Sequence, residues 1–294
     1  MRRLIGAALA VLLGAAPALT QEETIRIGFR KDAKPFSFED PAAALGVNGF
    51  LAQLCVRAFD PRVTDKRIEV VWVKSKERFG KLRSSSPEDR IDILCDPTSV
   101  TMDRANEFLF TNLVFASGVG YLRNPAAVGG DTIVGSLAET TAPAAVNIAI
   151  QQGRVKSLKG RRIIRDEDVS SHEEGIARIC AAEFEYYFGD LDIIRAMLAD
   201  ATESGVSGCE DVVDSENVTF SYEAYALATA PRRPDLAVFL QSRIFRLFSD
   251  GTARQLFQTH FPERAPSAAL QAILALNAIY PCGDILEEDP CRGP

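Results

Sequence analysis

A polar segment at residues 96–104 has the composition of an anion-binding site. It follows a short apolar run at 91–94, and Arg104 lies one helical turn beyond its hydroxyl groups. Those hydroxyls belong to Thr98, Ser99 and Thr101. The start of a helix has unpaired N–H groups and a partial positive charge, and an arginine can hold a carboxylate through two parallel hydrogen bonds. Taken alone, the segment is more simply interpreted as an N-capped surface helix.

The elements that would position this segment alternate between strand and helix. Strands are predicted at 24–29, 68–73 and 91–94, and helices at 47–59, 76–83 and 101–106. After a segment with Pro and Gly at 124–130 the pattern restarts, with strands at 132–136, 162–164 and 184–188 and helices at 142–152, 173–181 and 191–198. Such alternation implies parallel sheets covered by helices, with ligands bound beyond the carboxyl ends of the strands.

Two long β-type runs, 114–122 and 218–229, can carry the chain to a second sheet and back. Helices at 234–248 and 253–257 would then complete the first part, and 266–279 is also predicted to be helical. We therefore predict an α/β fold of two open-sheet lobes joined by two crossing strands, with a cleft between them. Lobe 1 would comprise residues 19–123 and 224–294, and lobe 2 residues 124–223.

The first 18 residues have the features of a secretory signal peptide. A basic start is followed by an apolar run from Leu4 to Ala16, and Ala16 and Ala18 are the small residues that a signal peptidase reads. The run is too short to span a bilayer. No cysteine stands at the cleavage site, so a lipid anchor is not expected. We predict a periplasmic protein.

Composition limits the partners of the chain. The formal net charge is −7, which makes nucleic acid and anionic membrane surfaces poor partners. The chain has only two histidines and no metal-ligand spacing, so neither a metal nor a cofactor is predicted. Six cysteines in an exported chain predict disulfides, although sequence alone does not fix their pairing. The most economical set is Cys55–Cys95, Cys180–Cys209 and Cys282–Cys291.

Several short motifs occur in a characteristic order and spacing over residues 24–262. They lie at 25–30, 35–38, 49–50, 77–79, 98–104, 139–141, 187–190 and 223–227. Together they resemble the periplasmic polar amino-acid-binding proteins that feed ABC importers, solute-binding family 3. The resemblance implies a type II periplasmic binding protein fold. It also implies a monomer that captures an amino acid in the interlobe cleft and delivers it to a membrane permease.

The resemblance implies a role for each matching residue. Arg104 would hold the α-carboxylate of the ligand, assisted by Ser99, and Thr140 and Thr141 would close over that carboxylate from the second lobe. Asp190 would pair with the ligand ammonium, because a desolvated ammonium needs an opposite charge. The alternative for Asp190 is a helix N-cap.

Four further residues resemble the set that the glutamate/aspartate-binding member of the family uses for the ligand side chain. They are Arg30, Ser75, Arg78 and His172. Three arginines carry more positive charge than a neutral amino acid requires, so glutamate or aspartate is the predicted ligand. The alternatives are an exposed strand-end residue for Arg30, a surface residue for Arg78 and a first-turn helix residue for His172, since two capping boxes overlap it.

Three residues depart from the family pattern. Pro97 removes a hydroxyl and an N–H from the predicted carboxylate site, and Glu139 stands where the family generally has glycine. Asp96 introduces an acid where glycine or serine is usual. An inward-pointing Asp96 would repel an acidic ligand or serve a second ammonium.

Two other functions fit the same scaffold. One is a periplasmic enzyme similar to the cyclohexadienyl dehydratases, with His172, Asp96 or Glu139 recruited as acid or base. The chain has no nucleophile elbow or phosphate loop, and we predict that it is not an enzyme. The other is a ligand sensor that docks on a receptor. The extension after Phe261 is predicted to clip onto lobe 1, with a docking surface as the alternative.

Overall fold

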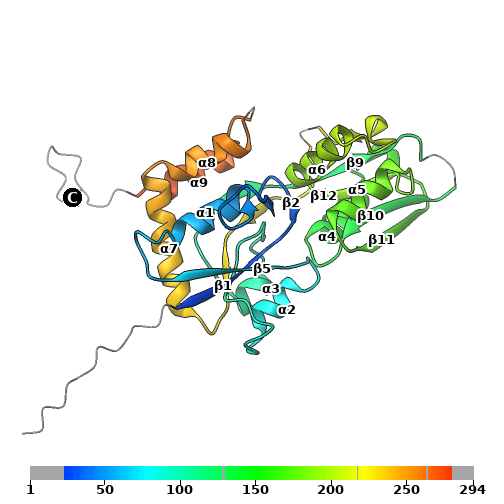
Figure 1. Cartoon of the computed structure of the whole chain (residues 1–294). Coiled ribbons are helices and arrows are strands. Elements are labelled where there is room, and N and C mark those ends of the chain that lie inside the picture. Colours follow the sequence, from blue (N-terminus) through cyan, green and yellow to red (C-terminus); the bar gives the residue numbers. More distant parts are fainter. Residues whose placement is uncertain (1–22, 128–129, 217, 263, 280–294) are drawn as a thin grey trace, which may run out of the picture.

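The chain forms two bodies, each built around a five-stranded sheet (Figure 1). This computed structural model describes residues 23–127, 130–216, 218–262 and 264–279. The predicted signal peptide at 1–18 and the Cys282–Cys291 pair lie outside these residues. Within them, no helix is both long and apolar enough to cross a bilayer.

The first sheet has the strand order β5-β1-β6-β15-β7. Its strands are β1 (Thr24–Phe29), β5 (Arg67–Trp72), β6 (Ile93–Leu94), β7 (Leu109–Phe110) and β15 (Ala228–Thr229). β1 runs parallel to β5 and β6, whereas β15 is antiparallel to β6 and β7. Ile25, Ile27 and Phe29 alternate along β1 and enter one large apolar core. Gly28 points to the other face, where a side chain would collide with Ile91.

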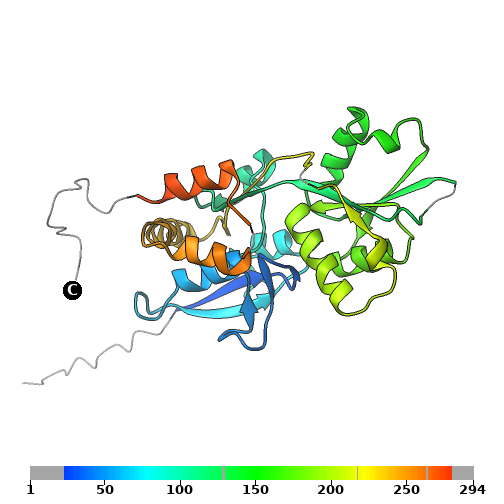
Figure 2. The same ribbon diagram turned by 90° about the horizontal axis from the view of Figure 1, so that it is seen from above.

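Helices cover both faces of the first sheet. The large core lies under α1 (Phe50–Ala58), α7 (Pro234–Ser249), α8 (Thr252–His260) and α9 (Ala268–Asn277). The opposite face packs on α2 (Arg78–Arg83) and residues that flank α3 (Met102–Glu107). Figure 2 shows the C-terminal helices α8 and α9 on the first body. The predicted helix at 266–279 is confirmed by α9.

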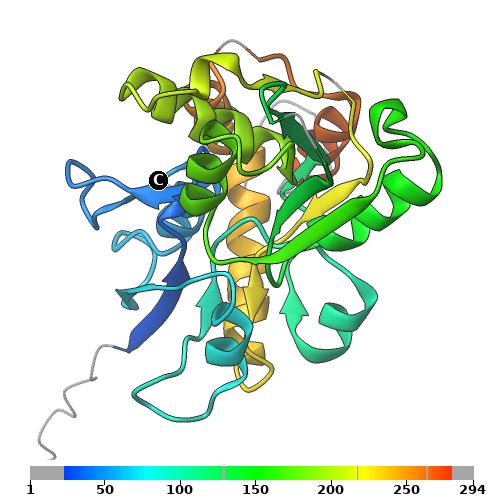
Figure 3. The ribbon, with the colours of Figure 1, turned by 90° about the vertical axis from the view of Figure 1, so that its right-hand side faces the viewer.

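The second sheet has the order β11-β10-β12-β9-β13. Its strands are β9 (Val119–Arg123), β10 (Thr132–Leu137), β11 (Ile163–Val169), β12 (Tyr186–Asp190) and β13 (Val213–Asp214). Along β12, Tyr186 and Phe188 face the core beneath α4 (Ala142–Gln151). Tyr187 faces the core formed with α5 (His172–Cys180) and α6 (Leu191–Glu203). Two 3₁₀ turns, η1 (Lys156–Leu158) and η2 (Cys209–Asp211), complete this body, which lies in front in Figure 3.

Two short antiparallel strands join the bodies. They are β8 (Phe115–Ser117) and β14 (Glu223–Tyr225). β9 already belongs to the second sheet, so the sheet change comes before the boundary expected after residue 123. The run at 218–229 is not one long strand, because β14 pairs with β8 and β15 pairs with β6 and β7.

A small sheet in the first body was not predicted. It consists of β2 (Asp32–Ala33), β3 (Ser37–Glu39) and β4 (Val47–Asn48). The helix predicted to start at 47 therefore starts at Phe50, because Val47 and Asn48 pair with β3. Gly49 makes the turn at a φ of 111°, and a side chain there would collide with the backbone of Phe36.

Both predicted disulfides that fall within the described residues are confirmed. Cys55–Cys95 joins α1 to the end of β6, and Cys180–Cys209 joins α5 to η2. The first bond therefore anchors the chain immediately before the polar segment at 96–104.

Candidate functional site

A cavity lies between the two bodies, at the carboxyl ends of parallel strands of both sheets. Arg30 directly follows β1, and Ser99 lies beyond β6. From the second sheet, His172 follows β11 and Asp190 ends β12. Strand ends of this kind are where open α/β sheets bind ligands. The free volume is small, ≈ 30 Å³, because the lining side chains close around it.

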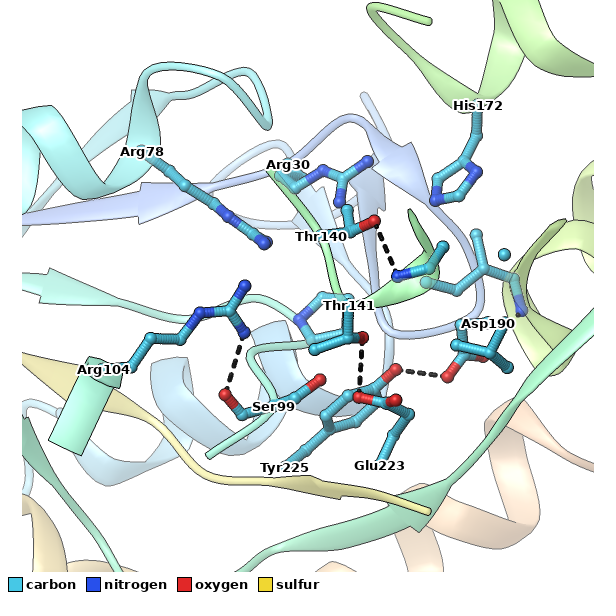
Figure 4. Close-up of a pocket in the computed structure, with 15 residues that line it drawn as sticks. Arg30, Arg78, Ser99, Arg104, Thr140, Thr141, His172, Asp190, Glu223 and Tyr225 are labelled. Atoms are coloured by element: carbon cyan, nitrogen blue, oxygen red, sulfur yellow. Dashed lines mark hydrogen bonds between the residues drawn. The ribbon is translucent and has the colours of Figure 1, made fainter. Parts of the chain in front are cut away.

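Most of the predicted site residues line this cavity. Those that do are Arg30, Arg78, Ser99, Arg104, Thr140, Thr141, His172 and Asp190. Ser75 is not among the lining residues; its hydroxyl donates to the carbonyl of Ala138 at 2.8 Å and so joins the two bodies. Figure 4 shows the guanidinium groups of Arg30, Arg78 and Arg104 directed into one space, with Asp190 across from Arg104.

Of the three arginines that line the cavity, Arg104 is the one that forms no ion pair with a carboxylate of the described residues. Thr101 caps α3 by accepting from the Arg104 N–H, which fixes the start of the helix. The Arg104 guanidinium donates to the backbone carbonyls of Ser99 at 2.9 Å and Glu139 at 3.4 Å. It also lies over the Phe79 ring, 4.6 Å from its centroid. Among the described residues, no carboxylate lies within ion-pair distance of it.

The pKa of Arg104 reflects the lack of a carboxylate partner. Burial, and then the charge of neighbouring Arg78, lower the pKa of Arg104 to about 10. The group stays charged at neutral pH, yet its charge is less well compensated than in water. An anion entering the cavity would supply the compensation.

Thr140 and Thr141 lie at the start of α4. The Thr140 hydroxyl donates to the carbonyl of Leu137 at 2.7 Å and accepts from the Ala142 N–H at 3.2 Å. The Thr141 hydroxyl donates to Glu223 Oε2 at 2.8 Å. Since Glu223 is in the crossing strand β14, Thr141 ties the second body to the junction.

Asp190 caps a helix and also lines the cavity. Its Oδ1 accepts from the N–H groups of Asp192 and Ile193, at 3.0 and 3.2 Å, and so caps α6. Its Oδ2 accepts from the Tyr225 hydroxyl, and the side chain lines the cavity. Burial, and then the nearby charge of Asp192, raise the pKa of Asp190 above its ordinary value.

Arg30 is paired with Asp32, a residue that the sequence did not point to. Arg30 Nε donates to Asp32 Oδ1 at 2.9 Å. Arg30 Nη2 lies 2.8 Å from the same oxygen without hydrogen-bond alignment and has no hydrogen-bond partner among the described residues. Burial opposes ionisation of Asp32, but the charge of Arg30 prevails and lowers the pKa of Asp32 to about 2. The pair is therefore ionised.

His172 lies in the first turn of α5, where Ser171 is the N-cap. Its backbone N–H donates to Asp32 Oδ2 at 2.8 Å, across the two bodies, and its Nδ1 is 3.0 Å from the Tyr187 hydroxyl. Burial, and then the charge of Arg30, lower the pKa of His172 to about 3. The imidazole in this cavity is neutral.

Arg78 is paired with Asp96, which is fully buried. Arg78 Nη1 donates to Asp96 Oδ2 at 2.5 Å, and the Thr98 hydroxyl donates to the other carboxylate oxygen. Arg78 Nη2 reaches the Glu139 carbonyl of the second body at 3.2 Å. Asp96 thus points inward, toward Arg78, and the alternative of a surface position for Arg78 is excluded by its burial.

Glu139 and Pro97 take different places in the site. Glu139 has a φ of 57° and an exposed side chain, while its carbonyl accepts from two arginines. A positive φ favours glycine, which accounts for glycine as the residue expected there. Pro97 lines the cavity without an N–H to offer a ligand.

Exposed ion pairs connect the rims of the two bodies. Lys34 Nζ lies 2.6 Å from Asp200, and Lys76 Nζ lies 2.5 Å from Asp168. Each of these side chains is more than a third exposed. Any separation of the two bodies must break both pairs.

The sequence and the fold match those of a known family. The sequence model of the bacterial extracellular solute-binding proteins, family 3, matches residues 25–263. The chain is a family 3 solute-binding protein. This confirms the type II periplasmic binding protein fold. No curated protein sequence matches this solute-binding protein.

Solved structures with the same fold share little sequence with this solute-binding protein. An ancestral arginine-binding protein bound to glutamine superimposes with a TM-score of 0.63 at 16% identity, over 83% of this chain and 100% of that chain. A Streptococcus pneumoniae substrate-binding protein with bound histidine gives 0.65 at 16% identity, over 83% and 94%. The ancestral amino-acid-binding protein AncCDT-1, a precursor of cyclohexadienyl dehydratase, gives 0.59 at 19% identity, over 81% and 95%.

Two polar lining residues of this solute-binding protein, Glu223 and Tyr225, were assigned no role from the sequence. Glu223 is buried, accepts from Thr141 and accepts from the Ser221 hydroxyl at 2.5 Å. Tyr225 is buried beside Asp190 and donates to it. The signal in the sequence was a glutamate among apolar residues of a predicted crossing strand. A local pattern of this kind does not show which cavity the strand lines.

Proposed function

We propose that this solute-binding protein captures a polar L-amino acid in the cavity between its two bodies and delivers it to the permease of an ABC importer. The observation that carries this proposal is the distribution of charge across the cavity. Arg104 lies on one side without a carboxylate partner, and Asp190 and Glu223 lie on the other. A zwitterion presents a carboxylate and an ammonium that match these two sides.

Each main-chain group of the ligand then has a place. Arg104, with Ser99, takes the α-carboxylate, and Thr140 and Thr141 close over it from α4. Asp190 takes the ammonium, with Glu223 adding a second negative charge nearby. An ammonium buried between carboxylates is compensated, whereas a neutral ligand without charged ends would leave Arg104 unmatched.

The side chain of the ligand faces Arg30 and Arg78. The prediction of glutamate or aspartate depended on the positive charge of these arginines, and Asp32 and Asp96 now offset that charge. Arg30 Nη2 can still donate a hydrogen bond. We propose a side chain with a neutral acceptor, as in glutamine, as the first choice, and glutamate or aspartate as the second.

The alternative of an enzyme finds less support in the arrangement of the residues considered for it. His172 is buried, neutral and hydrogen-bonded, and Asp96 is held by Arg78 and Thr98. The side chain of Glu139 is exposed. These contacts favour binding over proton transfer.

Calorimetric titration of ligand-stripped mature protein tests the proposal. L-Glutamine, L-glutamate, L-aspartate, L-histidine and L-arginine are titrated separately. We expect glutamine to bind with a micromolar or lower Kd and glutamate at least about tenfold more weakly, because its side-chain carboxylate would be buried beside arginines that are already compensated. No binding of any of the five would contradict the proposed function, and tighter binding of glutamate would restore the acidic ligand as first choice.

Ligand affinity should fall as the pH falls. The ammonium binds the ionised form of Asp190, whose pKa in the free protein is raised by burial and by Asp192. Below that raised pKa, protonation of Asp190 competes with the ligand, and affinity should drop by up to about tenfold per pH unit. His172 and Asp32 do not contribute in this range, because their pKa values are lowered to about 3 and about 2.

In the free protein, Asp190 should have the opposite effect. A carboxyl group whose pKa is raised by folding destabilises the fold when ionised, so Asp190 should add stability as the pH falls through the raised pKa. His172, whose pKa is lowered by folding to about 3, removes stability over part of the same range, so the Asp190 contribution is the difference in unfolding free energy between the parent and Asp190→Asn. Calorimetry and thermal unfolding from about pH 8 to about pH 5 measure both trends. Asp190→Asn should bind ligand weakly, and neither its affinity nor its stability should show the pH dependence attributed to Asp190. If the variant kept that pH dependence, another group would be its cause.

A further inference from the structure

Asp96 is a buried carboxylate placed among three arginines. It is 0% exposed, pairs with Arg78 at 2.5 Å, and its charge also acts on Arg30 and Arg104. It does not itself line the cavity, whereas its partner Arg78 does. A ligand therefore meets Arg78 but not the carboxylate that compensates it.

Both oxygens of Asp96 are occupied by permanent parts of the protein. One accepts from Arg78 and the other from the Thr98 hydroxyl. The preceding residue, Cys95, is tied to α1 by the disulfide with Cys55. The carboxylate is thus fixed in the wall of the first body and cannot swing away when a ligand enters.

The side-chain end of the cavity therefore already contains its own anions. Arg78 is matched by Asp96 and Arg30 by Asp32, at 2.5 and 2.8 Å. A carboxylate on the ligand side chain would have to leave water for a place where no uncompensated cation receives it. Burying an uncompensated charge is strongly unfavourable, whereas a neutral amide needs only hydrogen-bond donors.

We propose that Asp96 is the residue that determines side-chain specificity in this site, making it favour a neutral polar side chain over a carboxylate. This inference rests on the proposed function, amino-acid binding in the same cavity. Removing the charge of Asp96 frees Arg78 to receive an anion from the ligand.

The test is Asp96→Asn, which keeps the shape of the side chain and removes its charge. We expect the ratio of glutamate affinity to glutamine affinity, measured by calorimetry, to rise by about tenfold or more over the parent protein. Asp103→Asn is the matched control, since Asp103 lies on α3 in the same segment with an exposed side chain. Its ratio should equal that of the parent.

A double variant separates the charge of Asp96 from its shape. Arg78→Gln with Asp96→Asn removes both members of the pair, so the freed arginine is absent and the glutamate ratio should not rise. If Asp96→Asn alone does not fold without ligand, its refolding yield is compared in glutamate and in glutamine. Rescue by glutamate, but not by glutamine, would support the proposal, and equal rescue or none would overturn it.

The failures of the two proposals are distinguishable. If the parent binds none of the amino acids, the proposed function is overturned and the inference with it. If the parent binds glutamine but Asp96→Asn gains nothing for glutamate, only the specificity role of Asp96 is overturned. A parent that prefers glutamate over glutamine also overturns that role while leaving amino-acid binding in place.

Discussion

Replacing Arg104 with glutamine should abolish the binding of every amino acid, neutral or acidic. Arg104 is the cavity arginine that the described part of the chain does not pair with a carboxylate, so its charge is available to the α-carboxylate that all ligands share. Removing one partner of a buried, hydrogen-bonded charge pair costs about 2–5 kcal/mol. Affinity should therefore fall by about 30-fold or more, as measured by calorimetry.

Two further variants make this result specific. Arg104→Lys keeps the charge but loses the planar fork, so it should recover only part of the affinity. Arg254→Gln, an exposed residue of α8, removes the same charge away from the cavity and should bind like the parent. Retention of glutamine binding by Arg104→Gln within a few-fold would show that another group receives the α-carboxylate.

Removing the Cys55–Cys95 disulfide should produce the largest loss of stability. The bond closes a loop of 40 residues between α1 and the end of β6, and both cysteines are fully buried. In the chain-entropy account, a loop of this length stabilises the native state by about 4 kcal/mol. Urea unfolding of the Cys55→Ala/Cys95→Ala protein should show an unfolding free energy lower by roughly that amount.

The same variant should also bind ligand less well. Cys95 immediately precedes Asp96, so loss of the bond frees the start of the segment that leads to Ser99 and Arg104. Ordering that segment on binding would then cost free energy, and we expect about tenfold weaker affinity. Cys180→Ala/Cys209→Ala is the matched control, because its bond lies between α5 and η2. Equal effects of the two double variants on affinity would mean that the first disulfide does not position the segment.

Local sequence patterns were sufficient for most of the fold. The spacing of apolar residues located β1, β10 and the helices of both bodies, because each such pattern lies within a single element. The three short strands of the β2-β3-β4 sheet were missed because strands of two or three residues are too short to show a periodicity. The boundaries of β11, β12 and α6 also shifted by two or more residues, which is where tertiary pairing rather than the local pattern decides.

The sequence was sufficient to find single residues of the candidate site, but not the pairs in which one charge compensates another. Arg104 and Asp190 were identified from their motifs, and both line the cavity. The partner of Arg30 was missed although Asp32 is only two residues away, because its role depends on His172, 140 positions later. Asp96 had been noted, but only its burial against Arg78 shows which way it points. Counting charges in a sequence overstates the field in a pocket when their partners are unknown.

The two exposed ion pairs between the bodies, Lys34–Asp200 and Lys76–Asp168, should make the separation of the bodies sensitive to ionic strength. Exposed pairs of this kind are weakened by dissolved salt, whereas the buried pairs behind the cavity are screened much less. The energy needed to part the two bodies should therefore decrease as ionic strength rises, while the chemistry that selects the ligand stays the same. Salt should therefore change how readily the two bodies separate more than it changes which ligand the cavity prefers.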